Sequence, residues 1–159
     1  MNTALGVVQT FIAAIEAKDI DAAVALLSQT CEYDNVPMGK VVGPDAVRAT
    51  LGPFVAQCTT VEWVVFRESA TNSTVFNERL DRFHMPHGWV EIPVIGVWEV
   101  VDGLITLWRD YFDLATFRSQ LTPAGSPPPE GVGTPGEHRS AAAKRSPNVT
   151  VAPIAGVTS

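Results

Sequence analysis

One stretch of the sequence carries the most information about the fold, Asn77-Glu78-Arg79-Leu80-Asp81-Arg82-Phe83. A second stretch follows later in the chain, Leu107-Trp108-Arg109-Asp110-Tyr111-Phe112-Asp113. Both lie among β-branched and aromatic residues, which is typical of strands, and side chains on a strand alternate between its two faces. Arg79 and Asp81 are therefore predicted to share one face.

The same alternation in the second stretch places an acidic side chain with apolar ones, in the group Leu104, Thr106, Trp108 and Asp110. Such a carboxylate either points into an apolar interior or lies at the exposed end of the strand. Burial of an ionised carboxylate is costly unless a cation or a proton accompanies it. Arg79 could serve because its planar guanidinium can hold a carboxylate on each side.

The hypothesis is therefore a unit of Asp81, Arg79 and Asp110 at the wall of an apolar pocket. The alternative is that these residues are solvated surface charges, whose pairing contributes only a fraction of a kcal/mol. The strand pattern alone leaves both interpretations open.

The composition predicts one folded domain, residues 1–121, and a disordered tail, residues 122–159. The chain has 159 residues, 46% of them hydrophobic, which is enough for one domain with a substantial core. All aromatic residues fall between Phe11 and Phe117, whereas the tail has none and holds seven of the twelve prolines. The tail is rich in Pro, Gly and Ser and lacks periodicity, so it has little to bury.

Charge and cysteine content exclude several classes of partner. Residues 1–121 carry 8 basic and 15 acidic residues, a net charge of −7, so neither nucleic acid nor an anionic membrane is expected as a partner. Cys31 and Cys58 have no metal-site spacing and are expected to be free thiols in a reduced compartment. No leader-like N-terminus or membrane-length apolar run occurs, which predicts a cytoplasmic protein.

A helical hairpin is predicted at the N-terminus, with one apolar side to lay over a sheet. Thr3 can cap the first helix, Lys18-Asp19 ends it, and Asp19 or Asp21 opens the second. The apolar positions are Leu5, Val8, Phe11, Ile12 and Ile15 in the first helix, and Ile20, Ala23, Val24 and Leu27 in the second.

A short strand is expected over Cys31–Val36, ending at the turn signal Pro37-Met38-Gly39. In a strand, Tyr33 and Asn35 would point the same way. The pattern alone favours purely structural roles for both residues, with Asn35 as a turn residue and Tyr33 at a partly exposed rim.

A third helix is predicted to begin at Gly43-Pro44-Asp45 and to end or bend at Gly52-Pro53. Four strands follow, over Thr59–Glu68, Ser73–His84, Gly88–Val101 and Leu104–Asp113. A last short helix is expected over Leu114–Leu121, capped by Asp113 and with Phe117 packed inward.

Three features in the strand region have specific meanings. Asp102-Gly103 between two apolar runs predicts a type I′ hairpin turn, which needs positive φ at both residues. Pro93 inside a strand indicates an edge, a bulge or a sharp bend. His84 and His87 could be considered a metal pair, but without a third ligand in spacing they are interpreted as exposed turn residues.

The first stretch, together with Gly96-Val97-Trp98-Glu99-Val100-Val101-Asp102-Gly103-Leu104-Ile105-Thr106-Leu107-Trp108-Arg109-Asp110-Tyr111-Phe112-Asp113, resembles the limonene-1,2-epoxide hydrolase family. The helical hairpin, the Tyr-x-Asn pair and the order of the four strands add to this resemblance, which covers residues 3–121. It implies an α+β fold, a cone-like curved mixed β-sheet with the N-terminal hairpin and a third helix in its concavity, as in nuclear transport factor 2 and ketosteroid isomerase. It also implies a homodimer that uses no cofactor and no metal.

The resemblance also implies roles for five residues in adding water to a small apolar epoxide. Asp81 would donate a proton to the epoxide oxygen, and Asp110 would take a proton from the attacking water. Tyr33 and Asn35 would hold that water, and Arg79 would bridge the carboxyls.

This assignment agrees with the chemistry of the residues themselves. An Asp with its ordinary pKa of about 3.9 is almost never protonated at neutral pH, so apolar surroundings must raise the pKa of the acid. Two neighbouring Asp side chains in a dry pocket would retain one proton between them.

Two other functions are compatible with such a fold. One is a ketosteroid-isomerase-like or polyketide-cyclase-like enzyme that moves a proton, for which a bridging Arg is not expected. The other is a non-catalytic small-molecule-binding or dimerisation module.

Overall fold

The computed structural model describes residues 3–121, so the predicted tail, residues 122–159, lies outside the described part of the chain. The described part is an α+β domain with the helices and strands in the order α1 (Ala4–Glu16), α2 (Ile20–Val24), β1 (Leu27–Asn35), β2 (Gly39–Val42), α3 (Pro44–Ala56), β3 (Thr60–Thr71), β4 (Thr74–Met85), β5 (Gly88–Val101), β6 (Leu104–Tyr111) and α4 (Leu114–Gln120).

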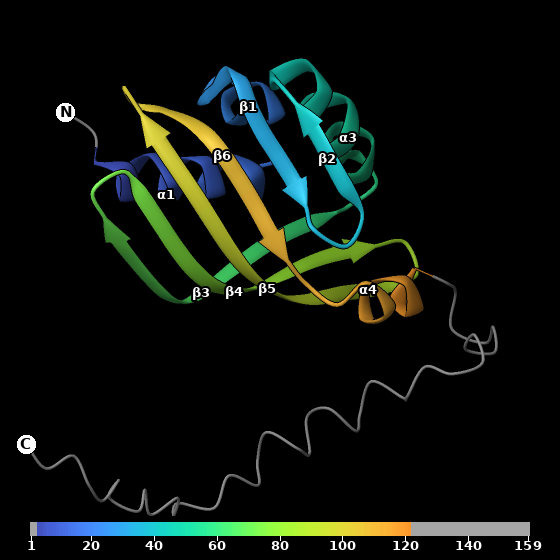
Figure 1. The fold of residues 1–159 in the computed structure, drawn as a ribbon. Helices are drawn as coiled ribbons and strands as arrows, with labels where there is room; N and C mark the ends of the chain where they lie inside the picture. Colours follow the sequence, from blue (N-terminus) through green and yellow to red (C-terminus); the bar gives the residue numbers. More distant parts are fainter. Residues whose placement is uncertain (1–2, 122–159) are drawn as a thin grey trace, which may run out of the picture. The chain divides into compact units, whose positions relative to one another are not determined.

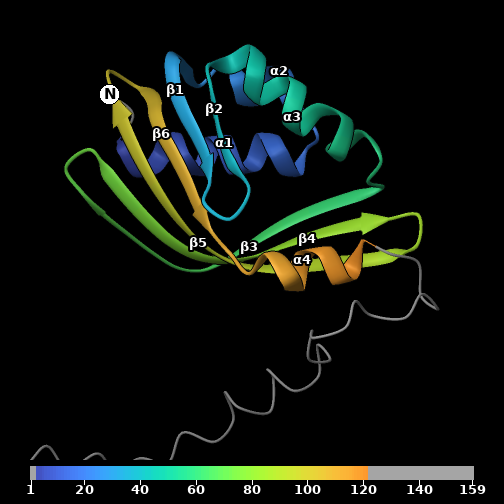
Figure 2. The same cartoon turned by 45° about the vertical axis from the view of Figure 1, so that its right-hand side comes forward.

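The six strands form one curved sheet in the order β2-β1-β6-β5-β4-β3. β1 runs parallel to β6, while the other neighbours are antiparallel, so the sheet is mixed as predicted. Helix α1 lies across the concave face, and α2 and α3 lie on the same side (Figures 1 and 2). This arrangement confirms the predicted fold class.

The N-terminal hairpin forms because both helices have side-chain caps. Thr3 accepts a hydrogen bond from Gly6 N at 3.1 Å, and Asp19 accepts one from Ala22 N at 2.9 Å. The buried face of α1 packs Phe11 edge-on against Trp108, with ring centroids 5.0 Å apart. The helix thereby covers the centre of the concave sheet face.

Before β3, the structure differs from the predictions in three places. Helix α2 ends at Val24, and Leu27, predicted to be helical, opens β1 because its backbone pairs with β6. Strand β2 was not predicted, since it is a short edge strand without a buried residue. Of the two outcomes predicted for α3 at Gly52-Pro53, an end or a bend, the end is wrong, because the helix continues to Ala56, with Val47 and Val55 buried on either side of the proline.

The turn predictions hold, and they explain how β5 is positioned. Asp102 and Gly103 both have positive φ, 52° and 76°, which confirms the I′ turn between β5 and β6. Pairing of β5 with β6 reaches Ile95 opposite Tyr111, so Pro93 lies beyond it, where β5 has only β4 as a neighbour. Pro93 is thus tolerated at a local edge.

A bulge in β6 contradicts part of the predicted face. Glu99 pairs with Leu107 and Val100 with Ile105, which leaves Thr106 without a partner on β5. Ile105 is consequently buried and Leu104 exposed, the reverse of the predicted alternation. Trp108 and Asp110, beyond the bulge, remain on the buried face as predicted.

Among residues 3–121, no helix is long and apolar enough to cross a membrane.

Candidate active site

The inner face of β4 carries the first half of the site. Every second residue of the strand is buried, and three of these buried side chains are polar or charged, Asn77, Arg79 and Asp81. The prediction that Arg79 and Asp81 share a face is confirmed. The charged groups lie in the concave interior because the apolar members of the same face fix the register of the strand.

Arg79 joins the two predicted carboxylates. Its Nε lies 2.7 Å from Asp81 Oδ1 and its Nη2 lies 3.1 Å from Asp81 Oδ2, a bidentate pair. The same Nη2 lies 2.7 Å from Asp110 Oδ2. Arg79 is 1% exposed and each Asp is 4% exposed, so the alternative of solvated surface charges is wrong.

The pairing of strands places Asp110 in a row of residues that crosses four strands of the sheet. In register, the row runs through Asn35 on β1, Asp110 on β6, Gly96 on β5 and Asn77 on β4. The guanidinium is further enclosed by aromatic rings, with its Cζ 4.7 Å from the ring centre of Trp63 and 5.6 Å from that of Trp98. Cation–π attraction is strongest where the cation is desolvated, as it is here.

Tyr33 and Asn35 lie beside Asp110. Tyr33 is buried and stacks on Trp108 with ring centroids 3.8 Å apart, so the prediction of a partly exposed rim position is wrong. Asn35 is the last residue of β1 and opens the turn that follows, where its backbone carbonyl accepts a hydrogen bond from Met38 N at 2.7 Å. It also lines the pocket with Tyr33, so the turn interpretation and the site interpretation both describe it.

Burial controls the protonation of the two acids. It raises the pKa of Asp81 to about 7, an effect that Arg79 opposes and that Asp110 and Glu16 reinforce. Burial also raises the pKa of Asp110, against the opposing effects of Arg79 and the Trp108 indole. Two such neighbours titrate as a pair that retains a proton near neutrality. The pKa of Tyr33 is likewise raised by burial, so its phenol stays neutral.

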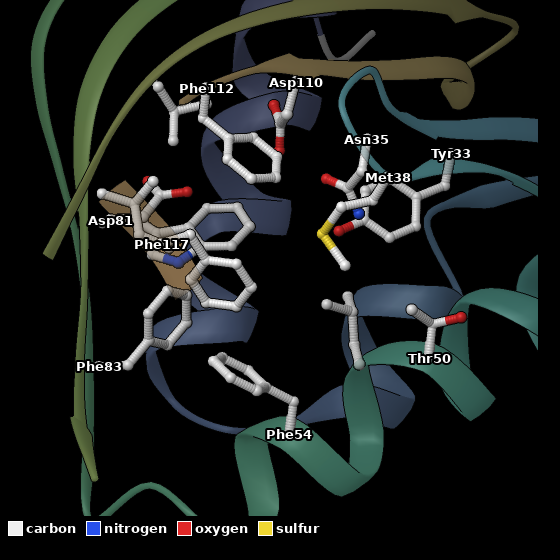
Figure 3. A pocket seen from close by; sticks show the side chains of 14 residues that line it. Tyr33, Asn35, Met38, Thr50, Phe54, Asp81, Phe83, Asp110, Phe112 and Phe117 are labelled. Carbon is white, nitrogen blue, oxygen red and sulfur yellow. The ribbon is translucent and has the colours of Figure 1, made fainter. Parts of the chain in front are cut away.

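The carboxyls open onto a pocket of about 150 Å³. Figure 3 shows Asp110 and Asn35 at one end and Phe54 and Phe83 towards the other. The residues that line it are Tyr33, Asn35, Met38, Thr50, Leu51, Phe54, Trp63, Asp81, Phe83, Ile92, Val94, Asp110, Phe112 and Phe117. Apart from Thr50, which lies towards the Phe54 end, the rest of the cavity is apolar and largely aromatic.

Two residues at the guanidinium were not predicted, Asn77 and Gly96. Asn77 Oδ1 accepts a hydrogen bond from Arg79 Nη1 at 3.0 Å, and Gly96 lies next to both groups. The alternation that grouped Arg79 with Asp81 also includes Asn77, so a signal for it was present. The sequence gives no comparable signal for Gly96.

The two histidines contact other groups. His84 Nδ1 contacts the hydroxyl of Thr59, and His87 Nε2 lies 2.8 Å from the carbonyl oxygen of Gln120. Within residues 3–121, no group of three or more His, Cys, Asp or Glu side chains could hold a metal ion.

Fold and site together define an α+β domain of the nuclear transport factor 2 type, with two acids buried on the inner face of its curved sheet. An NTF2-like protein from Cytophaga hutchinsonii has this fold, with a TM-score of 0.59 and 21% identity over 71% of this chain and 92% of that one. The model of the limonene-1,2-epoxide hydrolase catalytic domain matches residues 2–122. The chain therefore belongs to the limonene-1,2-epoxide hydrolase family.

Two matches from Mycobacterium tuberculosis, one of sequence and one of structure, support this membership. The chain is 36% identical to epoxide hydrolase EphG over 107 residues, 67% of this chain and 71% of the relative. It also matches the structure of an LEH-like epoxide hydrolase with a TM-score of 0.66 and 32% identity, over 72% of this chain and 86% of that one.

Proposed function

We propose that residues 1–121 form a catalytic domain that adds water to a small apolar epoxide in one step, giving a vicinal diol. The observation that carries this proposal is the buried Asp81–Arg79–Asp110 unit at the wall of an apolar pocket. The activity of the mycobacterial relative, an epoxide hydrolase by name, points the same way.

Asp81 is proposed as the general acid. Opening an epoxide leaves negative charge on the ring oxygen, and a protonated carboxyl can neutralise that charge as it develops. Burial raises the pKa of Asp81 to about 7, so a proton is available on the pair near neutrality. An exposed carboxyl would lack this proton.

Asp110 is proposed as the general base. Its Oδ2 is held by Arg79, whereas its Oδ1 is buried near the Trp108 indole and accepts no hydrogen bond of good geometry within residues 3–121. A water placed beside this oxygen could also reach Asn35 and Tyr33, which line the same end of the pocket. Three polar groups suffice to orient one water for attack.

The proposed reaction balances with epoxide and water alone. The water oxygen bonds to one ring carbon as that carbon's bond to the ring oxygen breaks. Asp110 takes a proton from the water, and the ring oxygen takes one from Asp81. The two carboxyls also raise the already high pKa of Arg79, so the guanidinium keeps its charge and the proton returns to Asp81 through solvent.

The proposal is tested with purified protein and a panel of terpene, styrene and alicyclic epoxides, with chiral analysis of the diols. A single turnover in ¹⁸O-labelled water is expected to place one labelled oxygen in the diol and none in the protein. Label in the protein would instead indicate a covalent ester. Absence of diol from the whole panel, with migration of a double bond in an enone, would favour the isomerase alternative.

We further propose that the protein is a homodimer that pairs through the outer face of the sheet. This face exposes large apolar side chains, which rarely form extended patches on monomers. Among them are Val64, Phe76, Ile95 and Tyr111, each 39–50% exposed. Light scattering should give twice the chain mass, and Ile95→Asp should halve it, while Val101→Asp, at the exposed end of β5, should not. A monomeric wild-type protein would contradict the proposal.

A further inference from the structure

Arg79 and Asp110 lie on strands that are not neighbours. Strand β5 separates β4 from β6, and two strand spacings amount to about 10 Å. The side chain of Arg79 must therefore cross β5 on the inner face of the sheet to reach Asp110. The residue of β5 that pairs with Asp110 on one side and with Asn77 on the other is Gly96.

Gly96 leaves the space that the guanidinium occupies. A Cβ at this position would lie closer than 3.0 Å to Arg79 Nη1, Asn77 Oδ1 and Trp98 Nε1, a separation that real Cβ atoms essentially never show. Gly96 has no positive φ, so its backbone does not require glycine. The absence of a side chain is needed for the close approach instead.

Asn77 fixes the nitrogen of Arg79 that the carboxylates do not hold. Its Oδ1 accepts one hydrogen bond from Arg79 Nη1 at 3.0 Å and another from Trp98 Nε1 at 3.2 Å. Two donors on one side determine that the amide oxygen faces them. Trp98 in turn is held by stacking on Trp108, with ring planes 4° apart.

The orientation of the Asn77 amide leaves one of its polar atoms unpaired, which suggests that this orientation has a function. Its Nδ2 is buried and has no hydrogen-bond partner within residues 3–121. A buried unpaired donor destabilises a fold and calls for an explanation. The explanation offered by the geometry is that a neutral acceptor is needed at Arg79 Nη1, where a third carboxylate would disturb the two acids.

We propose that Asn77, Gly96 and Trp98 form a seat that positions the Arg79 guanidinium so that one cation is shared between Asp81 and Asp110. All three are positioning residues, since among residues 3–121 the pocket lining includes none of them. The inference rests on the proposed function for its catalytic consequence. The sharing of the cation itself can be measured without any substrate.

The groups that face this cluster are known on each side. They are Asp81 on β4, Asp110 on β6, Tyr33 on β1 and Glu16 on α1. If the seat is lost, Arg79 keeps its bidentate pair with Asp81 on the same strand, and Asp110 loses its cation. The carboxyl of Asp110 should then hold its proton to higher pH.

The first test compares Gly96→Ala with Gly52→Ala. Gly52 lies in helix α3, where a Cβ meets no atom within 4 Å outside its chain neighbours, so alanine there should leave the carboxyl titration and kcat unchanged. Gly96→Ala should lower kcat for diol formation about 100-fold, the scale of a misplaced catalytic group, with KM within about twofold. Aspartate side-chain ¹³C NMR titration should show one carboxyl midpoint moved upward.

The second test keeps the inference open to refutation if Gly96→Ala does not fold. Asn77→Leu removes the acceptor, Asn77→Asp keeps it, and Val90→Ala makes a cavity at a buried residue of β5 outside the pocket lining. Asn77→Leu should lose kcat and shift the carboxyl titration. Asn77→Asp keeps an acceptor but adds a third carboxylate beside the two acids, so it should also lose kcat and shift the carboxyl titration, whereas Val90→Ala should lose stability only.

Unchanged carboxyl titrations in both Gly96→Ala and Asn77→Leu would overturn the seat, whatever the activity of the protein. If the titrations of the two variants shift but the wild-type protein forms no diol, the seat is retained and the proposed function is rejected. The two failures are therefore distinguishable.

Discussion

At the scale of single residues, the site depends on one cation that serves two buried acids. A buried ion pair is only weakly favourable in net terms, because desolvation offsets much of the attraction. Removal of one partner is far more costly than the pair is worth. We therefore interpret the arrangement as one that controls which carboxyl carries the proton. Substitution of an acid and substitution of Arg79 should have different effects.

The carboxyls should be needed for turnover and not for the fold. We expect Asp81→Asn and Asp110→Asn each to lower kcat by about 100-fold or more, the usual scale for loss of a general acid or base. The amides retain the shape of the side chains, so circular dichroism and the unfolding transition should show a folded protein. Turnover comparable to wild type in either folded variant would contradict the assigned roles.

Arg79 should be needed for the fold as well as for turnover. Arg79→Ala leaves Asp81 and Asp110 side by side without their cation, for which the expected loss is about 3–5 kcal/mol of unfolding free energy. The loss should be larger at pH 8 than at pH 5, because protonation relieves the two buried charges. Urea unfolding at both pH values measures it, and an equal loss at each would argue against two uncompensated acids.

The residue-level predictions show what strand alternation can and cannot supply. It placed Arg79 with Asp81 because β4 is regular along its whole length. It failed at Leu104 and Thr106 because a bulge in β6 reverses which residues face the interior before it. No residue in that stretch is a sequence signal for a bulge. Gly96 was beyond reach for another reason: its importance lies in side chains from β4 and not in its own strand.

At the scale of elements, α4 completes the pocket where β6 ends. Figure 2 shows α4 along the ends of the long strands. The side chain of Gln120 pairs with the backbone of Glu91 on β5, donating to its carbonyl at 2.9 Å and accepting from its N–H at 2.8 Å. It thus replaces part of the missing strand neighbour. The helix buries no residue fully, yet it brings Phe117 to the pocket.

Release of α4 should therefore affect substrate binding more than chemistry. Gln120→Ala removes the two hydrogen bonds to β5, together about 1.4 kcal/mol, and we expect KM to rise about tenfold while kcat changes little. Arg118→Ala, on the exposed side of the same helix, is the matched control. A fall in kcat at constant KM would place α4 in the chemical step instead.

The elements that sequence analysis missed share a physical property. Strand β2 buries nothing, so it has no hydrophobic period by which to be recognised, and it forms only because β1 offers an edge. The continuation of α3 past Pro53 depends on packing of Val55 and not on local propensity. Both are tertiary effects that override the local signals.

At the scale of the whole molecule, the sheet divides two functions between its faces. The concave face holds the acids and the pocket, which α3 and α4 help to line, while the outer face exposes apolar side chains. This division follows from the geometry of the strands, because successive side chains point alternately to the concave face and to the outer face. The concave face also sets how the folded protein responds to pH.

The buried acids should make the protein less stable as pH rises from about 4 to 7. The folded-state pKa of Asp81 is raised to about 7, above its unfolded value, so its contribution is fully present at low pH and is lost as pH rises through 7. Asp110 is shifted in the same direction. The sign is opposite to that of an ion-paired surface carboxylate, whose stabilising effect grows with pH.

Comparison with Asp81→Asn isolates this contribution from the other titrating groups. In that variant Arg79 serves Asp110 alone, so the pKa of Asp110 should fall and the pH dependence should weaken. One pKa unit corresponds to about 1.4 kcal/mol. Between pH 4.5 and 7.5, the unfolding free energy of the wild type should therefore fall by at least about 1 kcal/mol more than that of Asp81→Asn. Parallel curves from urea unfolding would mean that the two acids do not hold a shared proton in the folded state.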